Sequence, residues 1–184
     1  MTTIKTLAVL VVLAALAGVG FVYSGLYNIG ADSPHWPTTF ALVETLRERS
    51  IAARAAGIEV PADLDDRARV RSGAGNYDAM CVACHLKPGQ DESEIRRGLY
   101  PQPPNLASPE AAAANDPASQ FWVIKHGIKL TAMPAWSRGG VDDGTIWDMV
   151  ALLQELPTLS AQEFDALVEA SEGHSHEQGH DHDH

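Results

Sequence analysis

The nine residues from Ala79 to Lys87, AMCVACHLK, hold both cysteines of the chain, three positions apart, and a histidine directly follows the second cysteine. A disulfide oxidoreductase places such a pair after a strand in a βαβ unit, but the flanking residues here have a helical pattern without a parallel sheet. A structural zinc site takes four ligands, and no second ligand pair at zinc-finger spacing follows. Both interpretations leave part of the motif unexplained.

The pattern Cys81-x-x-Cys84-His85 is also the attachment signature of haem c, and this interpretation explains all three residues. Residues three apart share one face of a helical turn, so both thiols can add to the vinyl groups along one haem edge. The histidine then lies beneath the iron. We therefore predict one covalently bound haem c with His85 as an axial ligand of its iron.

The ligand on the other side of the iron decides what the haem can do, because a sixth ligand favours electron transfer and an open position permits gas or peroxide chemistry. Met133 lies in the loop KLTAMPAW, which Pro134 stiffens and which is far enough from His85 to cover the opposite haem face. The other methionines are weaker candidates: one precedes the apolar N-terminal segment, one adjoins a cysteine and one lies in the apolar stripe of a helix (Met1, Met80 and Met149, respectively). Met133 is the predicted ligand, and His126 is the alternative.

The N-terminal segment carries no charged residue from Thr6 to Ala31. Its apolar stretch from Leu7 to Leu26 would rise roughly 30 Å as a helix, which matches a bilayer core. Ala15-Leu16-Ala17 is similar to a signal-peptide cleavage site, but the apolar run continues past it, which favours an uncleaved anchor. The positive charge of Lys5 predicts a cytoplasmic N-terminus. Residues 1–31 are thus expected to be a membrane anchor or a signal peptide, with a single pass through the inner (cytoplasmic) membrane and a haem domain in the periplasm.

The remaining sequence has helical spacing and no useful period-2 alternation, so we expect an all-α fold. Residues 32–62 are interpreted as a juxtamembrane helix and linker, in which Glu44 and Glu48 pair with arginines of the same helix. Gly73 and Gly75 lower the helix propensity of the next helix and require a packing reason. Ser160 and Glu163 predict a capping box. Further helices are expected at about 65–84 and within 115–127, 142–157 and 160–170, with an irregular loop at 89–110.

The segments GAGNYDAMCVACH, PPNL, FWVIKHGI, MPAW and IWDMVALLQELP together resemble a monohaem class I c-type cytochrome from about Asp65 to Leu159. The resemblance implies a cytochrome c fold, and we place the cytochrome c domain at 63–160. The helix that follows the capping box forms a separate C-terminal segment at 161–172. It also implies that the carbonyl of Pro103 or Pro104 accepts a hydrogen bond from His85. Two aromatic residues occupy family positions: Tyr77 on the first helix and Trp136 near the haem propionates.

The last segment, 173–184, holds five of the eight histidines, interleaved with acids: His174, His176, His180, His182 and His184. This composition suits copper, nickel or zinc. A solvated tail with incidental metal affinity and an expression tag are the alternatives.

The formal net charge of −11 argues against a nucleic-acid partner. The predicted function is that of an electron-transfer protein rather than an enzyme. The resemblance implies redox protein partners: a bc-type quinol-oxidising complex as donor, and a terminal oxidase or copper-containing reductase as acceptor. The alternatives are a haem-linked copper-handling protein and a haem enzyme or gas sensor with a labile sixth ligand.

Overall fold

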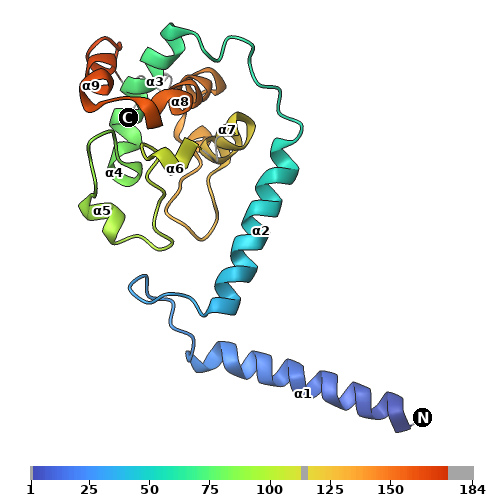
Figure 1. Cartoon of the computed structure of the whole chain (residues 1–184). Coiled ribbons are helices and arrows are strands. Elements are labelled where there is room, and N and C mark those ends of the chain that lie inside the picture. Colours follow the sequence, from blue (N-terminus) through green and yellow to red (C-terminus); the bar gives the residue numbers. More distant parts are fainter. Residues whose placement is uncertain (1, 113–115, 174–184) are drawn as a thin grey trace, which may run out of the picture.

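A computed structural model describes residues 2–112 and 116–173, and all the regular secondary structure in these two ranges is helical (Figure 1). The predicted all-α fold class is confirmed. The histidine-rich tail from 174 onward lies outside the described residues.

The first helix, α1 (Thr2–Ser24), extends away from the rest of the chain (Figure 1). In the described part of the chain it is the one helix that is long and apolar enough to cross a membrane, and none of its apolar window is buried. Both an anchor and a signal sequence have these properties.

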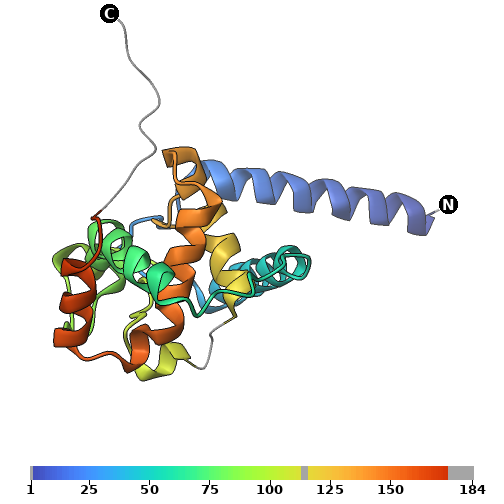
Figure 2. The same cartoon turned by 90° about the horizontal axis from the view of Figure 1, so that it is seen from above.

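The second helix, α2 (Pro37–Ala55), begins with a proline at its first position, where the missing N–H costs nothing. Arg47 pairs with Glu44 one turn earlier, as the charge pattern predicts. The connection from α1 is anchored to the helical domain because the backbone N–H of His35 donates to the hydroxyl of Tyr100 (3.1 Å). The helix then packs beside α7 (Pro117–His126), as both views show (Figures 1 and 2).

The core lies where α3 (Arg67–Met80) crosses α8 (Asp143–Glu155). Gly73 provides the packing reason that its sequence position requires: a Cβ there would lie 2.1 Å from the carbonyl oxygen of Asp148. Close contact between the two backbones therefore depends on this glycine. Around the crossing the side chains of Val70, Ile146 and Val150 are fully buried.

The expected helix at 65–84 is divided in two, because α3 ends at Met80 and a separate turn, α4 (Val82–His85), carries the histidine. The expectation of an irregular loop at 89–110 was also wrong in part. It contains the one-turn helix α5 (Glu94–Arg97), whose cap Ser93 accepts a bond from the backbone N–H of Arg96, and the start of α6 (Pro109–Ala112).

The C-terminal helix α9 (Ala161–Glu169) begins with the predicted capping box of Ser160 and Glu163. It packs on α3, and its Phe164 is fully buried with its ring edge-on to Tyr77 (6.1 Å between centroids). Two short 3-10 turns complete the described fold, η1 (Trp136–Gly139) and η2 (Leu156–Thr158).

Candidate haem site

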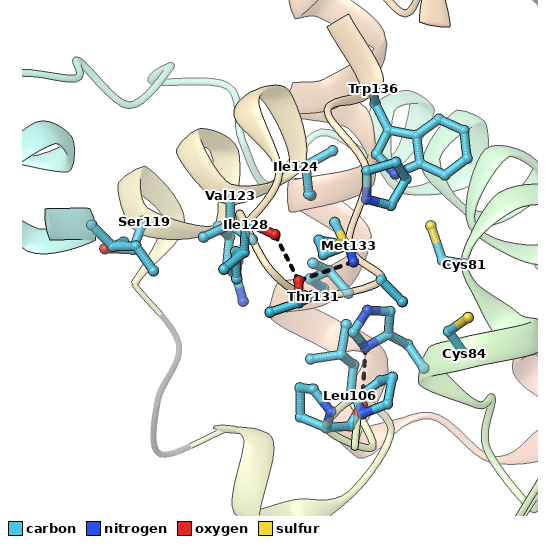
Figure 3. A pocket seen from close by; sticks show the side chains of 18 of the residues that line it. Cys81, Cys84, Leu106, Ser119, Val123, Ile124, Ile128, Thr131, Met133 and Trp136 are labelled. Carbon is cyan, nitrogen blue, oxygen red and sulfur yellow. Dashed lines mark hydrogen bonds between the residues drawn. The ribbon is translucent and has the colours of Figure 1, made fainter. Parts of the chain in front are cut away.

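The two cysteines lie where α3 gives way to α4. The backbone N–H of Cys81 still donates to Tyr77 (2.8 Å), and the N–H of His85 donates to the carbonyl of Cys81 (2.8 Å), so the motif forms one continuous turn. Both cysteines are free thiols, and burial raises the pKa of Cys81 to about 12. Their sulfur atoms face one end of a pocket (Figure 3).

His85 has one ring nitrogen fixed by the backbone. Its Nδ1 lies 3.0 Å from the carbonyl oxygen of Pro104, which can only accept, so Nδ1 carries the proton and donates. Burial lowers the pKa of His85, which favours the neutral ring. The other nitrogen, Nε2, therefore keeps its lone pair for a metal.

Of the two prolines expected near the histidine, Pro104 makes this contact and Pro103 does not. The carbonyl of Pro103 accepts from Nε of Arg96 (3.0 Å). The backbone around His85 is itself held in place, because the N–H of Leu106 donates to its carbonyl (3.1 Å). The orientation of the imidazole is thus determined by the loop that follows the motif.

The loop that carries Met133 is held by its own hydrogen bonds. Thr131 links two points of the loop, accepting from the N–H of Met133 (3.1 Å) and donating to the carbonyl of Ile128 (2.8 Å) (Figure 3). The N–H of Ile128 in turn donates to the carbonyl of Met133 (3.1 Å). Gly127 makes this turn possible, with a φ of 65° and a Cβ position only 2.7 Å from the carbonyl oxygen of Met133.

These groups enclose a cavity of about 520 Å³ lined mainly by apolar side chains. That volume is ordinary for a pocket that takes a cofactor. The cysteines, His85 and Met133 all line it. The alternative ligand His126 does not: it is exposed, and its ring lies 5.1 Å from that of Trp122.

Residues 68–153 match the family model described as "Cytochrome C oxidase, cbb3-type, subunit III". The matched segment is a monohaem c-type cytochrome domain. Comparison with curated proteins and with solved structures found no significant match.

Family membership implies a covalently bound haem c, and the site of this cytochrome fits that group. The apolar cavity is lined by two free thiols on one turn, which would attach the haem, and by an imidazole with a fixed tautomer and a thioether on a loop, which could bind its iron. A soft sulfur donor and an imidazole suit haem iron. In the described residues no group of three or more His, Cys, Asp or Glu side chains is arranged to hold a metal ion.

The other predicted site residues lie as follows. Tyr77 and Trp136 both line the pocket. The buried hydroxyl of Tyr77 donates to the carbonyl of Leu86 (2.7 Å), which fixes the chain just after His85. The placement of Trp136 near a haem propionate stays a prediction. Met80 and Met149 line the pocket as well, so pocket position alone does not single out Met133.

Among the pocket residues that the sequence did not indicate, four lie on α2, outside the predicted cytochrome c domain: Arg47, Glu48, Ile51 and Ala52. A signal for them did exist. Arg47, Ile51 and the buried Ala55 follow one another at four-residue spacing, so they share one face of the helix. Charge pairing within α2 is equally compatible with a solvated helix, and this weakened the signal.

Proposed function

We propose that this cytochrome is a membrane-tethered carrier of single electrons, with one haem c whose iron has His85 and Met133 as axial ligands. The observation that carries the proposal is the pair of fixed donors on one apolar pocket: His85 with its proton bound to Pro104, and Met133 on a loop tied by Thr131. The haem supplies one-electron chemistry when bound. We expect no bond-making chemistry, so the protein is not an enzyme.

The chain's own residues contribute orientation and exclusion of water. Pro104 holds the imidazole so that it needs no rearrangement when the charge of the site changes. The apolar lining keeps the site in a medium of low polarity, which disfavours the more highly charged oxidised state. A thioether ligand acts in the same direction. These residues therefore favour a raised midpoint potential.

The proposed location is the inner membrane, with α1 as a single-pass anchor and the haem domain in the periplasm. Haem c is attached covalently outside the cytoplasm, which supports this side, as does Lys5 near the N-terminal end of α1. Tethering raises the effective concentration of the domain near membrane partners.

The proposed donor is a bc-type quinol-oxidising complex, and the proposed acceptor is a terminal oxidase or a copper-containing reductase. The family description names a subunit of a cbb3-type oxidase, which supports a terminal oxidase among these partners.

Carbon monoxide binding to the reduced, full-length protein tests the proposal. A carrier with Met133 on the iron binds carbon monoxide slowly or not at all, because the thioether must leave first. A haem enzyme or gas sensor with an open or labile position binds it rapidly. Rapid binding by the wild type would therefore contradict the carrier function.

A copper-handling role is the second candidate, favoured by the five histidines of residues 173–184. Deleting this segment separates the two functions. A carrier keeps its rate of oxidase-coupled electron transfer and loses only affinity for copper. A copper-handling protein whose haem reduces the metal loses haem oxidation by copper(II) as well.

A further inference from the structure

α2 forms part of the wall of the haem pocket, although it lies outside the segment 68–153 that matches the family. Ile51 and Ala52 contribute apolar surface, and Arg47 and Glu48 lie one turn earlier. The helix is held there by packing on α7. It is therefore more than a spacer between the membrane segment and the domain.

The end of the pocket that α2 covers is the one away from the cysteines. Figure 3 shows Cys81 and Cys84 at one end and Ser119 at the other, and Ser119 belongs to α7, the helix on which α2 packs. The vinyl groups and the propionates of a haem lie at opposite edges of the macrocycle. Thioether bonds to the two cysteines therefore direct the propionate edge toward α2. Figure 3 shows Trp136 on the cysteine side of the pocket, so this orientation is an alternative to the expected position of Trp136 near a propionate.

Two propionates bring two carboxylates to this end of a mainly apolar pocket, and buried carboxylates need a cation or hydrogen-bond donors. Arg47 is the one lysine or arginine among the described residues that line the pocket. Arg96 also lies near His85, but it does not line the pocket, and its Nε and Nη1 are bound to Pro103 (3.0 Å) and Glu92 (3.1 Å).

The guanidinium of Arg47 can serve a second carboxylate. Its side chain is 30% exposed. Its Nη2 pairs with Glu44 and lies 4.0 Å from Glu48, and these are its carboxylate partners among the described residues. A guanidinium has five N–H donors in one plane, so it can bind a carboxylate of its own helix and a second carboxylate in the pocket at the same time.

We infer that Arg47 binds a propionate of the haem, and that α2 thereby completes the haem site. The inference rests on the haem occupying this pocket, but not on the identity of the sixth ligand or of the redox partners.

The charge of Arg47 then acts on the iron. The oxidised haem carries one more positive charge than the reduced haem, so a nearby cation disfavours oxidation and raises the midpoint potential. A propionate without this cation would also bind a proton more readily, which would couple reduction to pH.

The test is the midpoint potential of the purified full-length holoprotein as a function of pH. Arg47→Gln is compared with Arg49→Gln, which removes the same charge from an exposed position of the same helix. At alkaline pH, R47Q should have a lower potential than the wild type, and its potential should rise as the pH falls through the range in which the propionate takes up a proton. R49Q should stay close to the wild type. Equal shifts in R47Q and R49Q at every pH would overturn the inference.

If R47Q does not yield a folded holoprotein, Arg47→Lys is used instead, since lysine keeps the positive charge but lacks the planar set of N–H donors of a guanidinium. Redox-difference infrared spectra should then show a shifted propionate carboxylate band relative to the wild type and to R49Q, and an unshifted band would contradict the inference. The alternative is that Arg47 serves only as the ion-pair partner of Glu44. In that case R47Q and Glu44→Gln should lower the unfolding temperature by similar amounts, and the propionate band should not shift. The comparison of R47Q with R49Q does not depend on Met133 being the sixth ligand, because both variants have the same axial ligands as the wild type.

Discussion

A Cβ added at Gly73 would lie 2.1 Å from the carbonyl oxygen of Asp148, at the point where α3 and α8 cross. This distance is too short for two non-bonded atoms, so the position has no room for a side chain. Gly73→Ala must force the two helices apart, and we expect it to lower the free energy of unfolding by about 1–3 kcal/mol or more. Chemical denaturation of the haem-bearing protein measures this change.

Gly57→Ala is the matched control, because a Cβ at Gly57 meets nothing within 4 Å. It should change the free energy of unfolding by less than about 1 kcal/mol. Equal stability of G73A and G57A would show that the helix crossing does not depend on the glycine.

The hydroxyl of Tyr77 donates to the carbonyl of Leu86 in a buried position. Tyr77→Phe leaves that carbonyl without its donor, and we expect a loss of about 1–3 kcal/mol in the free energy of unfolding. Urea denaturation at neutral pH checks it. A loss no larger than the experimental error would mean that the hydrogen bond does not fix the chain after His85.

Tyr77 also predicts a pH dependence. Burial raises the pKa of Tyr77 in the folded state above its unfolded value of about 10. The folded state therefore holds this proton more tightly, and the stability it provides is lost as the pH rises above the unfolded value. The free energy of unfolding of the wild type should fall more steeply in that alkaline range than that of Y77F. Parallel curves for the two proteins would contradict this account.

Thr131 ties the loop that carries Met133 by accepting from its N–H and donating to Ile128. Thr131→Val keeps the shape but removes both bonds. We expect the loss of these bonds to destabilise the loop that holds Met133 by about 1 kcal/mol. Carbon monoxide should therefore bind reduced T131V roughly fivefold faster than it binds the reduced wild type. Stopped-flow mixing measures the rate.

Thr158→Val is the control for this loop, because Thr158 makes a similar bond to the carbonyl of Glu155 but does not line the pocket. Its rate should equal that of the wild type. Similar acceleration in both variants would indicate general loosening of the fold rather than release of Met133.

Much of this fold follows from local sequence signals. The Ser160–Glu163 pair predicted a helix start that the structure has, and the helix expected within 115–127 is present as α7. Gly73 predicted close packing, because a glycine lowers the stability of a helix and is therefore expected where a larger side chain would not fit. The motif around Cys81 predicted the cofactor, since its chemistry depends on local spacing.

Features that depend on tertiary contacts were harder to predict. α5 is a single turn stabilised by the Ser93 cap, too short to produce a periodic pattern. The role of α2 depends on its docking on α7, which is distant in the sequence. The choice between Pro103 and Pro104 required the position of Arg96, which occupies the first of the two carbonyls.

The central claim is that Met133 is the second axial ligand, and the optical spectrum of the ferric protein tests it most directly through the absorption band of the methionine–iron bond. Met133→Ala should keep the haem attached through both cysteines, lose this band and bind carbon monoxide rapidly once reduced. Met149→Leu, in the fully packed core beside the same pocket, should keep the band. An M133A spectrum identical to that of the wild type, or loss of the band in M149L alone, would contradict the assignment.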